Sequence, residues 1–209
     1  MSIASDARFW DKTSRKYARN AVADPAGYER TLDCTREYLT PQSSVLELGC
    51  GTGSTALVLA GGVKSYLATD VSPEMISIAE SKHADKLVPG LTFETATAET
   101  VAGTGYDAIL GFNYLHLVRD LPGTLRRIHD LLNDGGVFIS KTPCVGDMNP
   151  LIRLAIPVMR AIGKAPHVCV LQGGELGTAI DEAGFEILTS ESHNTKGNEP
   201  RPFIVARKR

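Results

Sequence analysis

The chain has 209 residues, of which 43% are hydrophobic and 22% are charged, so it can bury one core but is too short for two full ones. Its 22 basic and 24 acidic residues give a formal net charge of −2, which argues against a dedicated nucleic-acid-binding protein. We therefore expect a single domain over residues 1–209 and no nucleic-acid partner.

The sequence predicts neither a membrane span nor a metal site. No apolar run approaches the roughly 18 residues that cross a bilayer, and Met1–Trp10 lacks the apolar core of a signal peptide. The cysteines Cys34, Cys50, Cys144 and Cys169 lie far apart and show no metal-ligand spacing. These features favour a cytoplasmic protein with reduced thiols.

Residues 1–40 are expected to form an N-terminal helical cap. A mixed-charge segment with aromatic residues comes first, over about 5–20. Behind it Tyr28, Leu32, Thr35 and Leu39 recur at helical spacing, and Pro41 ends the pattern.

Strands and helices then alternate along the chain. Short apolar runs at 45–48, 65–69, 91–93, 107–111 and 137–140 predict strands. Helical patterns lie between them: Thr55–Ala60, a helix that starts at Ser72-Pro73-Glu74, and a stripe of Leu121, Leu125, Ile128 and Leu132. Such alternation is typical of a parallel sheet with helices on both faces.

The last part of the chain departs from this alternation. A helix is predicted over Glu175–Ala183, with Gly184 as its stop signal, and strands over Phe185–Thr189 and Phe203–Ala206. The connection Ser190–Pro202 is helix-poor and short for a parallel crossover, which usually contains a helix. The two last strands are therefore expected to form an antiparallel hairpin.

A glycine-rich turn, Glu47-Leu48-Gly49-Cys50-Gly51-Thr52-Gly53, joins the first strand to its helix. Glycines there let the backbone turn tightly and approach a ligand. The dinucleotide fingerprint G-x-G-x-x-G would need a third glycine where Ser54 stands. Asp70, at the end of the second strand, could accept the ribose hydroxyls of either a dinucleotide or another nucleoside cofactor. The acid is common to both classes and does not choose between them.

Longer motifs resemble one family. Val45–Gly53 (VLELGCGTG) resembles the first motif of class I, Rossmann-like S-adenosylmethionine-dependent methyltransferases, and Ala68–Met75 (ATDVSPEM) resembles their second. Tyr106–Val118 (YDAILGFNYLHLV) and Leu131–Ser140 (LLNDGGVFIS) are similar to their fourth and fifth strand segments, and Phe185–Ala206 to their last hairpin. The resemblance covers about residues 40–142 and 173–206. It implies a doubly wound α/β fold with a mostly parallel seven-stranded sheet, an antiparallel C-terminal hairpin and helices on both faces.

The resemblance also implies S-adenosylmethionine as cofactor and S-adenosylhomocysteine as its product. The residues that it places at the cofactor are Tyr17, Glu47, Gly49, Cys50, Gly51, Gly53, Asp70, Val71, Met75, Thr97, Ala98, Glu99 and Asn113. The glycine turn would run beneath the methionine part, with Glu47 near its amino group, and Asp70 would take the ribose hydroxyls. Many relatives have an aspartate where Thr97 stands, which leaves the partner of the adenine amino group open.

Several of these assignments have a structural alternative. Val71 and Met75 either flank the adenine or belong to the core, and Asn113 lies either near the methyl group or simply in a turn. Glu47 could be a structural acid, and Tyr17 either folds over the cofactor or does not. The one candidate general base is His116, which either faces the acceptor or packs beside the fourth strand.

The insertion at 143–172 is the most individual segment. Within it 150–164 is apolar and carries Arg153, Arg160 and Lys164 on one helical face, and Pro157 is expected to kink or split the helix. Three interpretations remain: a lid over an acceptor pocket, peripheral contact with a membrane, or packing in the core or a dimer.

We therefore predict an enzyme that methylates a small-molecule acceptor with an apolar or aromatic body, such as a lipid, a quinone or a natural product. One alternative is a non-catalytic S-adenosylmethionine-binding or interaction module on the same fold. Another is a nicotinamide-dependent oxidoreductase, which Ser54 and the terminal hairpin disfavour. The acceptor atom and the oligomeric state are not determined by the sequence.

Overall fold

The structure, a computed structural model, describes residues 3–196 and 200–209, with only the backbone at 152–154 and 161. Its centre is a seven-stranded sheet in the order β3-β2-β1-β4-β5-β7-β6. The strands are β1 (Ser44–Leu48), β2 (Ser65–Asp70), β3 (Leu91–Thr95), β4 (Tyr106–Phe112), β5 (Leu132–Lys141), β6 (Phe185–Ser192) and β7 (Pro202–Lys208). The first five are parallel, and β7 lies antiparallel between β5 and β6. The predicted fold class is confirmed.

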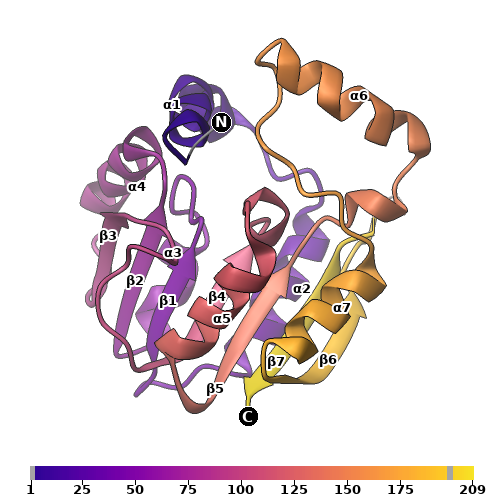
Figure 1. Cartoon of the computed structure of the whole chain (residues 1–209). Helices are drawn as coiled ribbons and strands as arrows, with labels where there is room; N and C mark the ends of the chain where they lie inside the picture. The colour runs from indigo at the N-terminus through magenta and orange to yellow at the C-terminus, as the bar shows by residue number, and fades with distance from the viewer. Residues whose placement is uncertain (1–2, 197–199) are drawn as a thin grey trace.

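Helices cover both faces of this sheet (Figure 1). They are α1 (Ile3–Arg19), α2 (Pro25–Arg36), α3 (Ala56–Leu59), α4 (Pro73–Asp85), α5 (Leu121–Leu131), α6 (Pro150–Ala161) and α7 (Gly173–Glu182). Short 3-10 turns lie at Ala60–Gly62, Leu115–Leu117 and Val145–Asp147. The helix predicted over 55–60 is therefore brief, and it ends in one of these turns.

Two cores follow from the alternation of side chains along the strands. Leu46 and Leu48 of β1 point to the face that α5 and α7 cover, where Leu125 and Ile180 are fully buried. Val45 points to the other face, against α2, α3 and α4. β1 thus carries apolar side chains on both faces, which is why this segment reads as a short apolar run.

The predicted start of α4 has the expected chemistry. Ser72 accepts a hydrogen bond from the Met75 amide at 3.1 Å, and Pro73 occupies the first turn. Asp24 and Asp120 cap α2 and α5 in the same way. An oxygen acceptor at this position satisfies an amide that the helix itself leaves without a partner.

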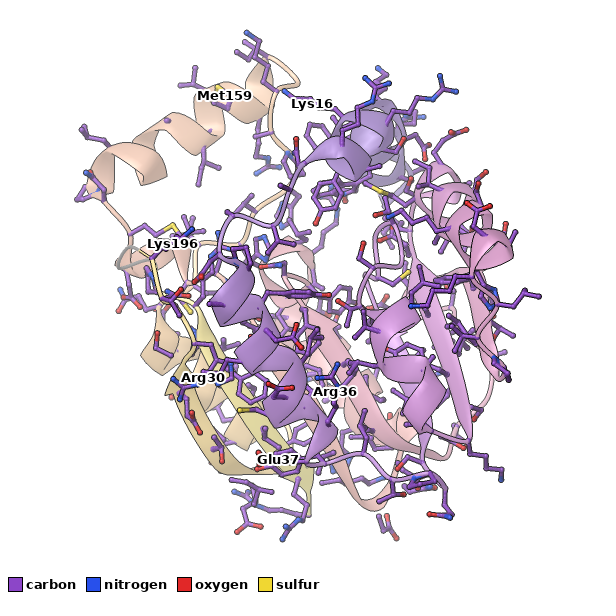
Figure 2. The ribbon with its side chains drawn as sticks, turned by 180° about the vertical axis from the view of Figure 1, so that it is seen from behind. Lys16, Arg30, Arg36, Glu37, Met159 and Lys196 are labelled. Carbon is purple, nitrogen blue, oxygen red and sulfur yellow. The ribbon has the colours of Figure 1, made fainter. Side chains whose placement is uncertain are left out.

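Two helices stand above the carboxyl ends of the parallel strands: α1, beside α4, and α6, on the side of β5 and β7 (Figure 1). Pro157 lies inside α6 without dividing it, so the helix is not split as one expectation had it. Leu151 and Val158 of α6 are exposed by 73% and 62%, and Ile162, directly after the helix, is exposed by 57%. Figure 2 shows α6, which carries Met159, standing apart from the sheet. Within the described part of the chain, no helix is long and apolar enough to cross a bilayer.

Candidate functional site

A first cavity, of about 650 Å³, lies at the carboxyl ends of the parallel strands. The chain runs from β1 to β2 and β3 in one direction and reaches β4 and β5 in the other. The connections that follow β1 and β4 therefore run to opposite sides of the sheet. Ligands of open α/β sheets bind at such a topological switch point. Helix α1 lies across this edge and contributes Ile3, Asp6, Trp10 and Tyr17 to the lining.

The glycine turn after β1 is built as the sequence predicts, but its three glycines serve different purposes. Gly49, Gly51 and Gly53 all have positive φ, at 70°, 55° and 73°, where other residues are strained. A Cβ on Gly51 would meet only the Tyr17 ring, at 3.6 Å, so this backbone borders open space. A Cβ on Gly49 would lie 2.9 Å from the Tyr114 ring. Gly51 is thus the position that lets a ligand approach the backbone.

Gly53 has a packing role instead. A Cβ at this position would lie 2.8 Å from both the Ala79 Cβ and the Phe93 ring. The glycine therefore permits close contact of the turn with α4 and β3, and it lines neither of the two described cavities. Gly53 was expected beneath the methionine part of a cofactor, but its surroundings favour the packing role.

Asp70 stands at the end of β2 with its carboxylate already oriented. Oδ2 accepts the Gly51 amide and Oδ1 accepts the Ser72 amide, both at 2.9 Å. The residue is 8% exposed and lines the first cavity. Desolvation raises its pKa, and the two amide hydrogen bonds oppose this rise. Each oxygen keeps a second lone pair with which it can accept a hydroxyl group.

Glu47 is buried on the other side of the turn, where its Oε2 accepts the Tyr66 hydroxyl at 2.8 Å. Desolvation raises its pKa to about 7. Glu47 lines a second cavity of about 470 Å³, together with Cys50 and the backbone of Gly49 and Gly51. A carboxyl group with a pKa near 7 exists in both its protonated and its ionised form at neutral pH. It can therefore bind either a proton or a cation at little cost.

The residues expected around an adenine are brought together, with one exception. Val71, Met75, Thr97 and Glu99 line the first cavity. Ala98 is fully buried, so only its neighbours face the cavity. The Thr97 amide donates to the Thr100 hydroxyl at 2.9 Å, and Glu99 accepts the Thr124 hydroxyl at 2.8 Å. The first bond lies within the loop after β3, and the second holds this loop against the start of α5.

Asn113 and His116 follow β4. Asn113 has a φ of 53°, the one positive value among the non-glycine residues described, and it lines both cavities. His116 lines the first cavity, and its Nδ1 is buried with no hydrogen-bond partner in the described structure. Desolvation and the charge of Arg201 lower the His116 pKa to about 4. The imidazole is therefore neutral at pH 7 and able to accept a proton.

Long-range contacts hold helix α1 over the first cavity, and no local sequence pattern predicts them. Arg119 donates to both carboxylate oxygens of Asp6 at 2.8 Å, and Asp11 accepts the Ser72 hydroxyl at 2.6 Å. Tyr17 lines both cavities, and desolvation followed by the charge of Asp70 raises its pKa. The roles of Asp6, Asp11 and Arg119 were not predicted from the sequence, because their partners lie far away along the chain.

The 143–172 insertion contributes little to the described lining. Pro143 borders the first cavity, and no described side chain of α6 lines either one. The side chain of Arg153, part of the expected basic face, lies outside the described residues. Burial raises the pKa of the Cys144 thiol to about 11, so this residue is not prepared to act as a nucleophile.

Comparison with known proteins supports a common family. A family model described as a methyltransferase domain matches residues 15–190. The chain is 28% identical over 202 residues to arginine-hydroxylase NDUFAF5, mitochondrial, of Danio rerio, covering 94% of this chain and 60% of that protein. It is 31% identical over 154 residues to the ubiquinone biosynthesis O-methyltransferase of Azorhizobium caulinodans, covering 68% of this chain and 58% of that protein. The chain spans at most about 60% of the length of these curated relatives.

Solved structures share the fold. Magnesium protoporphyrin IX methyltransferase from Synechocystis, solved with bound SAH, superposes with a TM-score of 0.72 at 19% identity, covering 98% of this chain and 96% of that one. An S-adenosylmethionine-dependent methyltransferase from Listeria monocytogenes, described as putative, gives a TM-score of 0.71 at 20% identity, covering 88% and 97%.

Proposed function

The chain belongs to the class I, Rossmann-like S-adenosylmethionine-dependent methyltransferases, and we propose that it transfers the methyl group of S-adenosylmethionine to a small-molecule acceptor with an apolar or aromatic body. The observation that carries the proposal is the open backbone of Gly51 beside the oriented carboxylate of Asp70, both in the lining of the first cavity.

The residues present fit the proposed cofactor. Gly51 leaves room where a Cβ would project, and the acid at the end of β2 presents free lone pairs to a pair of ribose hydroxyls. Val71 and Met75 offer apolar faces on the same side. A third glycine, which a dinucleotide turn requires, is replaced by Ser54, so the nicotinamide alternative has no support here.

The remainder of the first cavity suits an apolar acceptor. Its lining there consists mainly of large apolar side chains, contributed by Ile3, Trp10, Phe112, Leu117, Val118 and Pro143. Cavities of roughly 300–1,000 Å³ are typical of small-molecule sites, and this one falls within that range. One curated relative is named for ubiquinone biosynthesis and another as a polyketide synthase, and these names are consistent with such an acceptor.

When bound, the cofactor supplies an electrophilic methyl group, so the chain has to align the acceptor, exclude water and remove a proton where the acceptor requires it. We assign alignment to the apolar walls and to Asn113, at the junction of the cavities. Helix α1, held by Asp6 and Asp11, excludes water. His116, which lines the first cavity and is neutral at pH 7, is our candidate to take the proton.

A binding and a transfer assay together test this function. We expect S-adenosylhomocysteine to bind the purified protein and a methyl label to pass from S-adenosylmethionine to members of a panel of phenols, quinols and carboxylic acids. Binding without any transfer would favour the non-catalytic alternative. Transfer to peptides or RNA, with none to small molecules, would contradict the proposed acceptor class.

A further inference from the structure

The second cavity differs from the first in its charge. The Asp, Glu, Lys and Arg side chains that line the first are mainly acidic: Asp6, Asp70, Glu99 and Asp120 against Arg119 and Arg201. The second is lined by Lys141, Lys196 and Arg201 against Asp24 and Glu47. Opposite charge excesses on the two sides of Tyr17 favour ligand groups of opposite charge.

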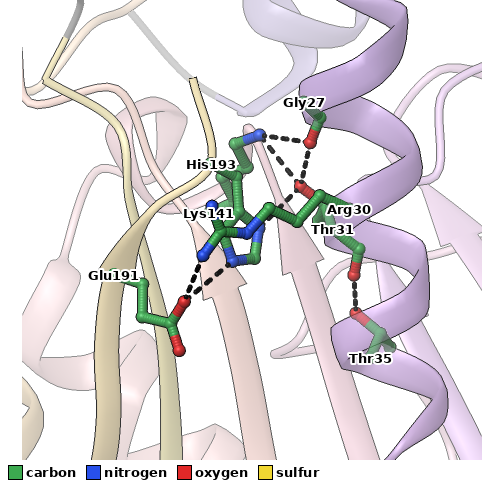
Figure 3. A network of polar contacts seen from close by, with 7 residues as sticks. All are labelled: Gly27, Arg30, Thr31, Thr35, Lys141, Glu191 and His193. Atoms are coloured by element: carbon green, nitrogen blue, oxygen red, sulfur yellow. Dashed lines mark hydrogen bonds and ion pairs between the residues drawn. The ribbon is translucent and has the colours of Figure 1, made fainter. Parts of the chain in front are cut away.

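Lys141 is the central cation of the second cavity. It is half-buried at the end of β5, and its Nζ donates to the Thr31 hydroxyl at 2.9 Å and to the Gly27 carbonyl at 3.3 Å (Figure 3). Both acceptors are neutral. Among the ion pairs of the described residues, none involves Lys141. Desolvation lowers its pKa, as does Arg201, whereas Asp24 raises it.

The two acidic side chains of this cavity, Asp24 and Glu47, accept hydrogen bonds from donors other than Lys141. Asp24 accepts hydrogen bonds from the amides of Gly27 and Thr195 and from the Thr195 hydroxyl. Glu47 is bonded to Tyr66, and burial keeps part of it protonated near pH 7. A partly buried cation whose nearest partners are neutral is costly, and an anion bound beside it offsets that cost.

The position of Lys141 is supported by the buried side chains of Thr31, His193 and Phe203. Thr31 also pairs with Nδ1 of His193 at 3.1 Å, and the His193 ring stacks on Phe203 at 4.4 Å between centroids. Figure 3 shows Lys141 and His193 converging on Thr31 of α2, with Glu191 on the far side of the histidine. This support sets the ammonium group in one place, as a binding site requires.

Arg201 connects the second cavity to the place of reaction. It lines both cavities, and its Nη1 donates to Oδ1 of Asn113 at 3.5 Å. Asn113 also lines both. A molecule held by its anionic group between Lys141 and Arg201 can therefore present the rest of its structure toward Asn113.

We propose that Lys141 and Arg201 form a subsite for a carboxylate group carried by the methyl acceptor. This inference rests on the proposed function, because it names the class of acceptor as an apolar or aromatic acid. The carboxylate of the cofactor's methionine part has the same chemistry, and the experiment below separates these two sources.

The test compares two probes of matched shape, benzoate and benzamide, by calorimetry on the protein saturated with S-adenosylhomocysteine, in a buffer low in competing anions. We expect benzoate to bind at least tenfold more tightly than benzamide. Lys141→Met should remove this preference and leave the affinity for S-adenosylhomocysteine unchanged. Lys86→Met, which alters an exposed lysine outside both cavities, is the matched control.

Two outcomes would each overturn the proposal. Equal or absent binding of the two probes to the wild-type protein would show that the cavity does not select a carboxylate. A Lys141→Met variant that loses affinity for S-adenosylhomocysteine but keeps the preference for benzoate would assign the cations to the cofactor. Arg201→Gln provides a second variant, should the loss of Lys141 disturb α2. Failure of S-adenosylhomocysteine to bind would count against the proposed function itself, and the probes are then compared on the free protein.

Discussion

The Gly51 amide lies 2.9 Å from Oδ2 of Asp70, so the glycine turn after β1 is hydrogen-bonded to the acid that ends β2. The bond orients the carboxylate before any ligand arrives, and the Ser72 amide holds its other oxygen. The two parts of the sequence that carry the family resemblance therefore form one unit.

The first prediction follows from this unit. Asp70→Ala should weaken the binding of S-adenosylhomocysteine by about 1–3 kcal/mol, because hydrogen bonds from the ribose hydroxyls to a charged group are lost. Calorimetry measures the change, and Asp85→Ala, an exposed acid on α4, is the control. An affinity that Asp70→Ala leaves unaltered would refute the ribose assignment.

The second prediction separates two glycines that look alike in the sequence. Gly53→Ala should destabilise the fold by about 1–3 kcal/mol, since its Cβ would press on Ala79 and Phe93. Gly51→Ala carries the same strain of a positive φ, but its Cβ projects into the open space between the turn and Tyr17, so it should chiefly weaken ligand binding. Thermal melts and calorimetry on both variants check this division. Equal effects of the two on stability would contradict it.

The third prediction concerns pH. The Glu47 pKa is raised to about 7, and a bound ammonium group would lower it, so the ionised form binds the cofactor more strongly. Affinity for S-adenosylhomocysteine should therefore rise with pH up to about 7 and fall as the pH drops below it. Glu47→Gln should flatten this dependence, whereas Glu80→Gln on the surface of α4 should not. The affinity is measured as a function of pH for each variant. If Glu47→Gln leaves the pH dependence unchanged, Glu47 has no part in binding.

The fourth prediction tests the candidate base. The His116 pKa is lowered to about 4, so the imidazole becomes protonated only near that pH, and activity limited by it should persist down to about pH 4. For a phenolic acceptor, His116→Gln should lower kcat by about 10²–10⁴-fold if the residue takes the proton. Affinity for S-adenosylhomocysteine should stay the same. A variant with an undiminished kcat would leave His116 as a packing residue.

The fifth prediction addresses the cover formed by α1. Asp6→Asn removes one charge from the paired Asp6 and Arg119, which are 18% and 28% exposed. We expect faster release of S-adenosylhomocysteine in stopped-flow measurements, with a loss of up to about 1 kcal/mol in affinity, as is usual for pairs near the surface. Arg119→Gln should give the same result, and the double variant should add nothing further. Additive effects would show that the two residues act separately.

Local patterns determined much of the fold and the cofactor end of the site. Short apolar runs gave the strands, and the helix-poor connection before Phe203 correctly indicated an antiparallel end. The carboxyl ends of neighbouring parallel strands meet at one edge, so Gly51 and Asp70 could be placed together from their positions alone. These features are local or follow from sheet geometry, and a sequence carries them directly.

Other parts of the site were decided by tertiary packing. Arg119 meets Asp6 across 113 positions of the chain, and Lys141 meets Thr31 across 110. Gly53 could be assigned to α4 and β3 only once those elements were in place. Such contacts depend on how helices settle over the sheet, and no periodicity in the sequence records which side chains will face each other there. The sequence therefore defined the cofactor turn and its acid, whereas the packing of α1, α2 and β7 determined the cover and the charge of the second cavity.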